Sequence, residues 1–116
     1  MQQGEKMEFK EYQDDAKKTA IYAGVLSKDY AYLVLGMVGE TGEVAEKIKK
    51  ILRDKSGVIN EHDQIELKKE LGDVLWYLSN LATELGLSMD DIAKSNIEKV
   101  LSRKERNVLH GQGDNR

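Results

Sequence analysis

Apolar positions recur along most of the chain with the spacing of one face of an α-helix. Near its start, Phe9, Tyr12 and Ala16 follow one another at intervals of three and four residues, as in an amphipathic helix. Three later stretches repeat the pattern. The predicted helices are Glu8–Ala23, Tyr30–Arg53, Glu61–Leu85 and a fourth that begins after Ser88.

Polar residues at the breaks between these stretches predict where the helices begin. Residues 54–60 (DKSGVIN) form a predicted loop, and Asn60 is placed to cap the third helix with Asp63 in its first turn. Ser88 takes the same position before the fourth helix, with Asp91 three residues later.

The second predicted helix carries a broad apolar face interrupted by glycines. The residues expected to be buried are Val34, Met37, Val38, Thr41, Val44, Ala45, Ile48, Ile51 and Leu52. Gly36, Gly39 and Gly42 lie inside this helix, and each costs about 1 kcal/mol relative to alanine. Close helix packing or the close approach of a ligand would explain them.

Long helices with short connections predict an all-α fold, a four-helix bundle with antiparallel neighbours. We expect one domain at 1–106 and a flexible tail at 107–116, where the helical pattern stops. Trp76 and Tyr77 lie off the main stripe of the third helix. This surplus apolar surface predicts a symmetric partner chain that completes the bundle, in a homodimer or homotetramer.

Composition narrows the class of protein. A chain of 116 residues fits a single domain, and the absence of proline permits long helices. The absence of cysteine excludes disulfides and thiolate chemistry. A net charge of -3 gives no general attraction to nucleic acid, and no apolar run is long enough to cross a membrane. We therefore expect a cytoplasmic protein with neither nucleic acid nor membrane as a partner.

Candidate chemistry lies in two pairs of acidic residues. Glu40 and Glu43 are three residues apart on the second helix and share one edge beside its apolar face. Glu70 and Asp73 repeat this spacing on the third helix. If the two helices pack antiparallel, four carboxylates can converge next to the core, whereas Glu46 points to solvent.

Four carboxylates at one place repel each other strongly, and a divalent cation resolves this conflict. Oxygen ligands without histidine favour Mg²⁺, with Mn²⁺ as a possible substitute. A di-iron site of the ferritin type would need a Glu-x-x-His pair that His62 and His110 do not supply. The competing interpretation is an ordinary solvated face, because acids at this spacing are common on amphipathic helices.

The surroundings of these acids resemble a known family. The segments LGMVGETGEVAEKIKK (Leu35–Lys50) and KKELGDVLWYLSNLATELGLSMDDIAKSNIEKV (Lys68–Val100) are similar to the MazG-like nucleotide pyrophosphohydrolases of the all-α NTP pyrophosphatase superfamily. The family pattern is ExxE followed by ExxD, matched by the two acidic pairs. The resemblance implies a MazG-like bundle and Mg²⁺-dependent hydrolysis of a nucleoside triphosphate to its monophosphate and pyrophosphate.

The resemblance also implies roles for the acids. Glu40, Glu43, Glu70 and Asp73 are the expected metal ligands, and Glu43 is the choice for the base that accepts a proton from the attacking water. Lys47 shares the edge of Glu40 and Glu43, where it would contact substrate or instead pair with Glu43.

Further substrate contacts are expected outside the acidic pairs. Asn96, Lys99 and Arg103 share one edge of the fourth helix, and the resemblance makes Asn96 and Lys99 contacts to sugar or phosphate. The two cations would otherwise be solvated charges. Tyr77 is expected to stack on the base, and Gln13 to hydrogen-bond a base edge. Trp76 is assigned to a different face, at a dimer interface.

Two alternatives remain open at this point. A non-catalytic helical dimerisation or interaction module would explain the amphipathic helices, although it gives no reason for paired acids beside the core. A related hydrolase of another pyrophosphate, such as phosphoribosyl-ATP, would also use helical carboxylates. Binding of Mg²⁺ separates the first alternative from the enzyme, and product analysis separates the second.

Overall fold

The structure of the chain, a computed structural model, describes residues 5–21 and 30–116. These residues form four α-helices: α1 (Phe9–Lys18), α2 (Tyr30–Lys55), α3 (Glu61–Glu84) and α4 (Met89–Glu105). Neither described range contains a strand, and the predicted all-α fold with four helices is confirmed. No helix in these ranges is both long and apolar enough to span a bilayer.

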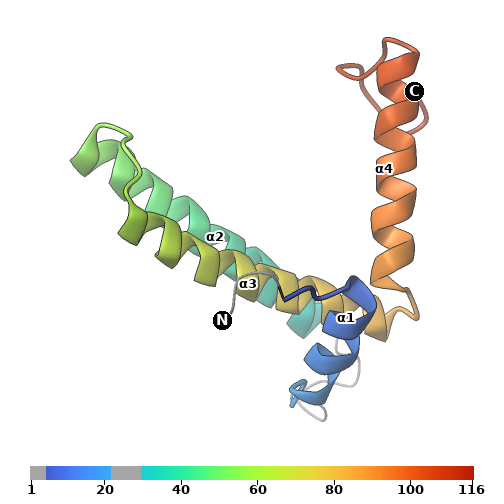
Figure 1. The fold of residues 1–116 in the computed structure, drawn as a ribbon, viewed down its shortest axis with the longest axis horizontal. Coiled ribbons are helices and arrows are strands. Elements are labelled where there is room, and N and C mark those ends of the chain that lie inside the picture. The colour runs from blue at the N-terminus through green and yellow to red at the C-terminus, as the bar shows by residue number, and fades with distance from the viewer. Residues whose placement is uncertain (1–4, 22–29) are drawn as a thin grey trace.

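The centre of the fold is an antiparallel hairpin of α2 and α3 (Figure 1). Between the two helices the chain reverses through Ser56 and Gly57, which have φ angles of 54° and 80°. The predicted cap of α3 is confirmed as a reciprocal capping box. The Asp63 backbone N–H donates to Asn60 Oδ1 (2.8 Å), and the Asn60 N–H donates to Asp63 Oδ2 (3.1 Å).

Close packing in the hairpin explains one of the three glycines of α2. A Cβ atom at Gly36 would overlap the ring of Tyr77 on α3, so only glycine lets the two helices approach this closely here. Apart from the adjoining backbone of α2 itself, no described atom lies within 4 Å of a Cβ built on Gly39 or Gly42. Their cost in helix propensity is therefore not explained by packing within one chain.

Much of the apolar face predicted for α2 is exposed, which corrects the expected burial. Val38 and Leu52 are each 63% exposed, and Leu35, outside that predicted face, is 70% exposed. A helix paired with one neighbour can bury only a narrow stripe, and in α2 that stripe includes Leu33 and Ile51. The wider apolar face of α2 has no cover among the described residues.

The short helix α1 joins the hairpin to α4 through Gln13. Its amide nitrogen Nε2 donates to Thr83 Oγ1 (3.1 Å) and to the carbonyl of Leu87 (2.9 Å), while its Oε1 accepts from the backbone N–H of Met89 (2.9 Å). α1 ends at Lys18, earlier than expected; Ala23, its predicted end, lies outside the described residues.

The last helix, α4, projects away from the hairpin (Figure 1). It packs against α1 near its start, and Ile97 and Leu101 on it are more than half exposed. Residues 107–116 form turns that return along the end of α4. The flexibility of this segment and the domain boundary at 106 stay predictions.

Candidate metal and nucleotide site

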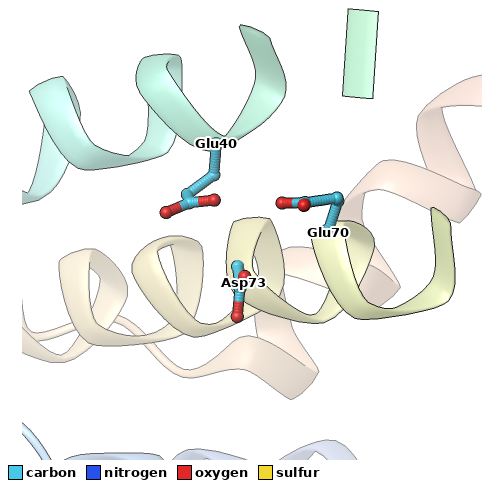
Figure 2. A group of neighbouring side chains, drawn as sticks. All are labelled: Glu40, Glu70 and Asp73. Carbon is cyan, nitrogen blue, oxygen red and sulfur yellow. The ribbon is translucent and has the colours of Figure 1, made fainter. Parts of the chain in front are cut away.

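Three carboxylates meet across the α2–α3 hairpin. Glu40 comes from α2, and Glu70 and Asp73 come from successive turns of α3 (Figure 2). One carboxylate oxygen of each lies within 4.8 Å of the other two. Glu40 and Glu70 are partly buried and Asp73 is exposed. The structure therefore brings together three of the four predicted ligands, at a place where a cation can enter from solvent.

The electrostatics of this group favour a bound cation. Burial, followed by the charges of Asp73, Glu70 and Glu43, raises the pKa of Glu40 above its ordinary value. The raised pKa means that an ionised Glu40 is unfavourable in this half-buried place without a counterion. The donor set is made of carboxylate oxygens alone, which fits Mg²⁺ or Mn²⁺.

Glu43 lies beside this group without belonging to it. Its side chain is exposed one turn after Glu40, and its charge contributes to the raised pKa of Glu40. A carboxylate in this position is free to face a water molecule. Its roles as ligand and as base stay predictions.

Lys47 contacts the acidic group from α2. Its Nζ lies 3.8 Å from Glu70 Oε1 on α3, and both side chains are partly exposed. The ion pair thus crosses the hairpin, instead of joining Lys47 to Glu43 within one helix. A cation here offsets part of the negative charge and lies within reach of an anionic ligand of the site.

Two aromatic rings extend the site beyond the acids. Trp76 and Tyr77 line a depression of about 310 Å³ together with Glu40 and Asp73. The two rings meet edge to face, with centroids 5.0 Å apart, and the Trp76 indole N–H donates to Thr19 Oγ1 (2.8 Å). Placing Trp76 on another face was wrong, because residues three and four positions after Asp73 both lie one turn along the same side of α3.

Two tyrosines that sequence reasoning did not assign to the site also lie near it. Burial raises the pKa of Tyr12 on α1, and the charge of Asp73 raises it further, which places Tyr12 within reach of that carboxylate. Tyr32 on α2 has its ring 6.5 Å from that of Tyr77. Burial, then Tyr32 and Glu40, raises the pKa of Tyr77. The spacing of eight residues between Tyr32 and Glu40 was the sequence signal that could have indicated Tyr32. No sequence signal indicated Tyr12.

The remaining predicted contacts do not meet the acids within one chain. Asn96 and Lys99 line a separate hollow of about 460 Å³ at the start of α4, and Arg103 is buried further along this helix. Because α4 projects away from the hairpin, none of the three joins the group in Figure 2. Gln13 uses its amide group at the junction of α1, α3 and α4.

Comparison with known proteins gives two matches that cover most of the chain. A family model described as the MazG nucleotide pyrophosphohydrolase domain matches residues 28–108. The chain is also similar to the Gene 37 protein of Mycobacterium phage L5, with 47% identity over 109 residues that cover 90% of this chain and 96% of the phage protein. The name of that relative states no activity, and no solved structure gives a significant match. The chain belongs to the MazG nucleotide pyrophosphohydrolase family.

Proposed function

We propose that this protein hydrolyses a nucleoside triphosphate to the nucleoside monophosphate and pyrophosphate, with Mg²⁺ as its cofactor. The observation that carries the proposal is the convergence of Glu40, Glu70 and Asp73 from two helices onto one place. Membership in a pyrophosphohydrolase family supports the same reaction class. Three carboxylates held this close by two helices repel one another, and a divalent cation between them would offset that repulsion.

Glu40, Glu70 and Asp73 would hold the metal. When bound, Mg²⁺ supplies neutralisation of the triphosphate and polarisation of a phosphoryl oxygen. Glu43, exposed beside the group, accepts the proton of the attacking water. Lys47, near Glu70, offers its ammonium group to a phosphate oxygen.

The aromatic depression would hold the nucleoside. Trp76 and Tyr77 lie next to Glu40 and Asp73, and their rings give apolar surface on which a base or sugar can pack. This placement puts the triphosphate toward the acids and the nucleoside toward the rings.

The enzyme acts as a homo-oligomer, at least a dimer. Leu35, Val38 and Leu52 leave an apolar side of α2 uncovered, and α4 carries the exposed Ile97. A second copy packed on these faces would bury them. Because α4 projects away from its own hairpin, we infer that Asn96 and Lys99 would reach the acids from the α4 of a second copy.

A panel of canonical and damaged nucleoside triphosphates tests the reaction. The full chain is incubated with each compound and Mg²⁺, and the products are separated by chromatography. Monophosphate and pyrophosphate in equal amounts support the proposal. Binding of Mg²⁺ in a calorimeter is a parallel measurement, and its absence would favour a non-catalytic interaction module. Cleavage only of another pyrophosphate, such as phosphoribosyl-ATP, would move the protein to the related hydrolases.

A further inference from the structure

The segment after α4 lies against Lys99 and Arg103, two cations of that helix. We call residues 107–116 the C-terminal strap. Most of it follows the part of the chain that the family model matches, 28–108. In Figure 1 the strap returns along the end of α4. Gly113, at φ 82°, gives the left-handed turn just before Asp114.

Asp114 in the strap bridges Lys99 and Arg103 of α4. One oxygen of its carboxylate, Oδ1, lies 3.3 Å from Lys99 Nζ and 3.3 Å from Arg103 Nη2. The same guanidinium nitrogen donates to the backbone carbonyl of Asp114 (2.7 Å). The strap therefore offers the two cations an oxygen-rich anionic group, as a phosphate would.

The contact of Asp114 with Lys99 and Arg103 is suited to replacement by an external anion. Asp114 is 83% exposed, whereas the Arg103 side chain beneath the strap is only 7% exposed. Arg103 Nε is buried and has no hydrogen-bond partner among the described residues. Arg103 and Lys99 hold the pKa of Asp114 below its usual range, so its carboxylate is ionised at neutral pH. The exposed carboxylate at 3.3 Å is a weak contact, and the stronger contact that an entering anion must also replace is the 2.7 Å hydrogen bond from Arg103 Nη2 to the Asp114 carbonyl.

Lys99 links the strap to the neighbouring hollow. Its side chain also lines the depression formed by Ser88, Asp91 and Asn96 at the start of α4. An anion seated in that hollow could therefore reach Lys99 directly, and could reach Arg103 only after the strap has moved.

We propose that the C-terminal strap is autoinhibitory: Asp114 occupies Lys99 and Arg103 as an internal substitute for phosphate, and an oligophosphate binds there by displacing it. The choice of a nucleoside triphosphate as the natural displacing ligand rests on the proposed function. Because only molecules whose strap is displaced can bind the oligophosphate, its apparent affinity falls in proportion to the fraction of molecules in that state.

The test is a titration of the full chain with inorganic pyrophosphate in metal-free buffer. In Asp114→Asn the internal competitor loses its charge, and we expect binding at least about threefold tighter than in the wild type. Asp14→Asn, on the exposed face of α1, makes the same change in net charge and should leave the affinity unchanged. In the double variant Lys99→Gln/Asp114→Asn the gain should be lost. Equal tightening in the two single variants would overturn the proposal.

Hydrogen exchange gives a second readout that needs no substitution. Pyrophosphate should speed exchange of the amides of residues 107–116 in the wild type, because the strap leaves α4. Unchanged or slower exchange there would contradict displacement, and would fit a strap that only caps the helix.

Kinetics separates this inference from the proposed reaction. With a cleaved nucleoside triphosphate, Asp114→Asn should lower KM and leave kcat unchanged. If the wild type cleaves no triphosphate but Asp114→Asn binds pyrophosphate more tightly than the wild type, the proposed function fails and the strap inference stands. If triphosphates are cleaved and neither KM nor pyrophosphate affinity responds to Asp114→Asn, the strap inference fails alone.

Discussion

At the scale of single residues, the acidic group makes the sharpest prediction. Glu40→Gln removes one of three converging carboxylates, so kcat/KM should fall by about 100-fold or more. The same change relieves repulsion in the metal-free protein, so the melting temperature in EDTA should stay equal or rise. Mg²⁺ should stabilise the wild type and have little effect on the variant. Activity assays and thermal melts with and without Mg²⁺ measure both effects.

Glu46→Gln is the matched control for that substitution. Glu46 lies on α2 less than two turns after Glu40, but it pairs with Lys49 (3.0 Å) and Lys50 (3.8 Å), away from Glu70 and Asp73. Removing the charge of Glu46 should leave the activity nearly unchanged. Equal losses in the two variants would contradict the assignment of the acids to the hairpin site.

Asp63 gives a prediction of pH dependence. The Lys55 ammonium, at 2.7 Å, and the backbone N–H of Asn60 lower the pKa of Asp63 below its ordinary value of 3.8. Ionised Asp63 therefore stabilises the folded chain above about pH 3.8, and this contribution is lost as the pH falls through the lowered pKa. Asp63→Asn should lower the melting temperature at neutral pH, and the difference should shrink in acid.

Thermal melts of both proteins from neutral pH to about pH 2 follow that difference. Asp15→Asn, which breaks the exposed pair with Lys18, is the comparison and should change little at any pH. A gap between Asp63→Asn and the wild type that stays constant into acid would mean that shape, not charge, is what Asp63 contributes.

Sequence reasoning found the acids of the site and missed much of its aromatic wall. Helical spacing placed Glu40, Glu70 and Asp73 on facing edges because that argument needs only 3.6 residues per turn and an antiparallel pair. Tyr12 comes from another helix, and no local pattern gives the angle at which α1 crosses α3. Trp76 was placed on another face, although its spacing of three residues from Asp73 puts both on one side of α3. The part that sequence reasoning could not supply is its hydrogen bond to Thr19, which joins α3 to a residue far away in the chain.

At the scale of elements, the glycines of α2 give a matched pair of substitutions. Gly36→Ala forces a methyl group into the ring of Tyr77, and we expect a loss of about 1–3 kcal/mol in the free energy of unfolding. Apart from the adjoining backbone of α2, Gly39→Ala meets no described atom within 4 Å and should gain up to about 1 kcal/mol in helix propensity. Urea unfolding of the two variants measures the contrast.

The activity of Gly39→Ala carries separate information. A variant that is more stable and fully active would mean that the space at Gly39 is unused. A stable variant with lost activity would mean that substrate or a second copy enters that space. A loss of stability in Gly39→Ala equal to that in Gly36→Ala would contradict the packing described for the hairpin.

The sequence determines where the helices begin better than it determines which surfaces pack against them. Local capping chemistry predicted the starts of α3 and α4 correctly, because Asn60 and Ser88 act on the backbone next to them. Burial of the wide apolar face of α2 was predicted and holds only in part within one chain: Ile51 is buried, whereas Val38 and Leu52 are exposed. An apolar stripe indicates that one face of a helix packs against another surface. Which helix or which chain provides that surface depends on the tertiary and quaternary arrangement, and helical periodicity does not encode it.

At the scale of the whole molecule, the exposed side of α2 predicts assembly. Val38→Arg puts a charge into the proposed contact between copies, so light scattering at micromolar concentration should show a shift toward monomer. Activity should fall with it, because the second copy would supply Asn96 and Lys99. Val38→Leu keeps an apolar side chain and should keep both assembly and activity. A wild type that is fully active as a monomer would contradict this prediction.

The choice of the substrate bond that the proposed enzyme cleaves also depends on the assembled molecule. Under the proposed function the acids of the hairpin would hold Mg²⁺, and Lys47 together with Lys99 of a second copy would contact the distal phosphates, so that pyrophosphate would be the leaving group. Hydrolysis in ¹⁸O-labelled water tests this by mass spectrometry of the products. Water that attacks the α-phosphorus leaves the label in the monophosphate, and water that attacks the β-phosphorus leaves it in pyrophosphate. We expect the label in the monophosphate. Release of orthophosphate with a nucleoside diphosphate accumulating would require attack at the terminal phosphorus, and would overturn the assignment whatever the metal requirement.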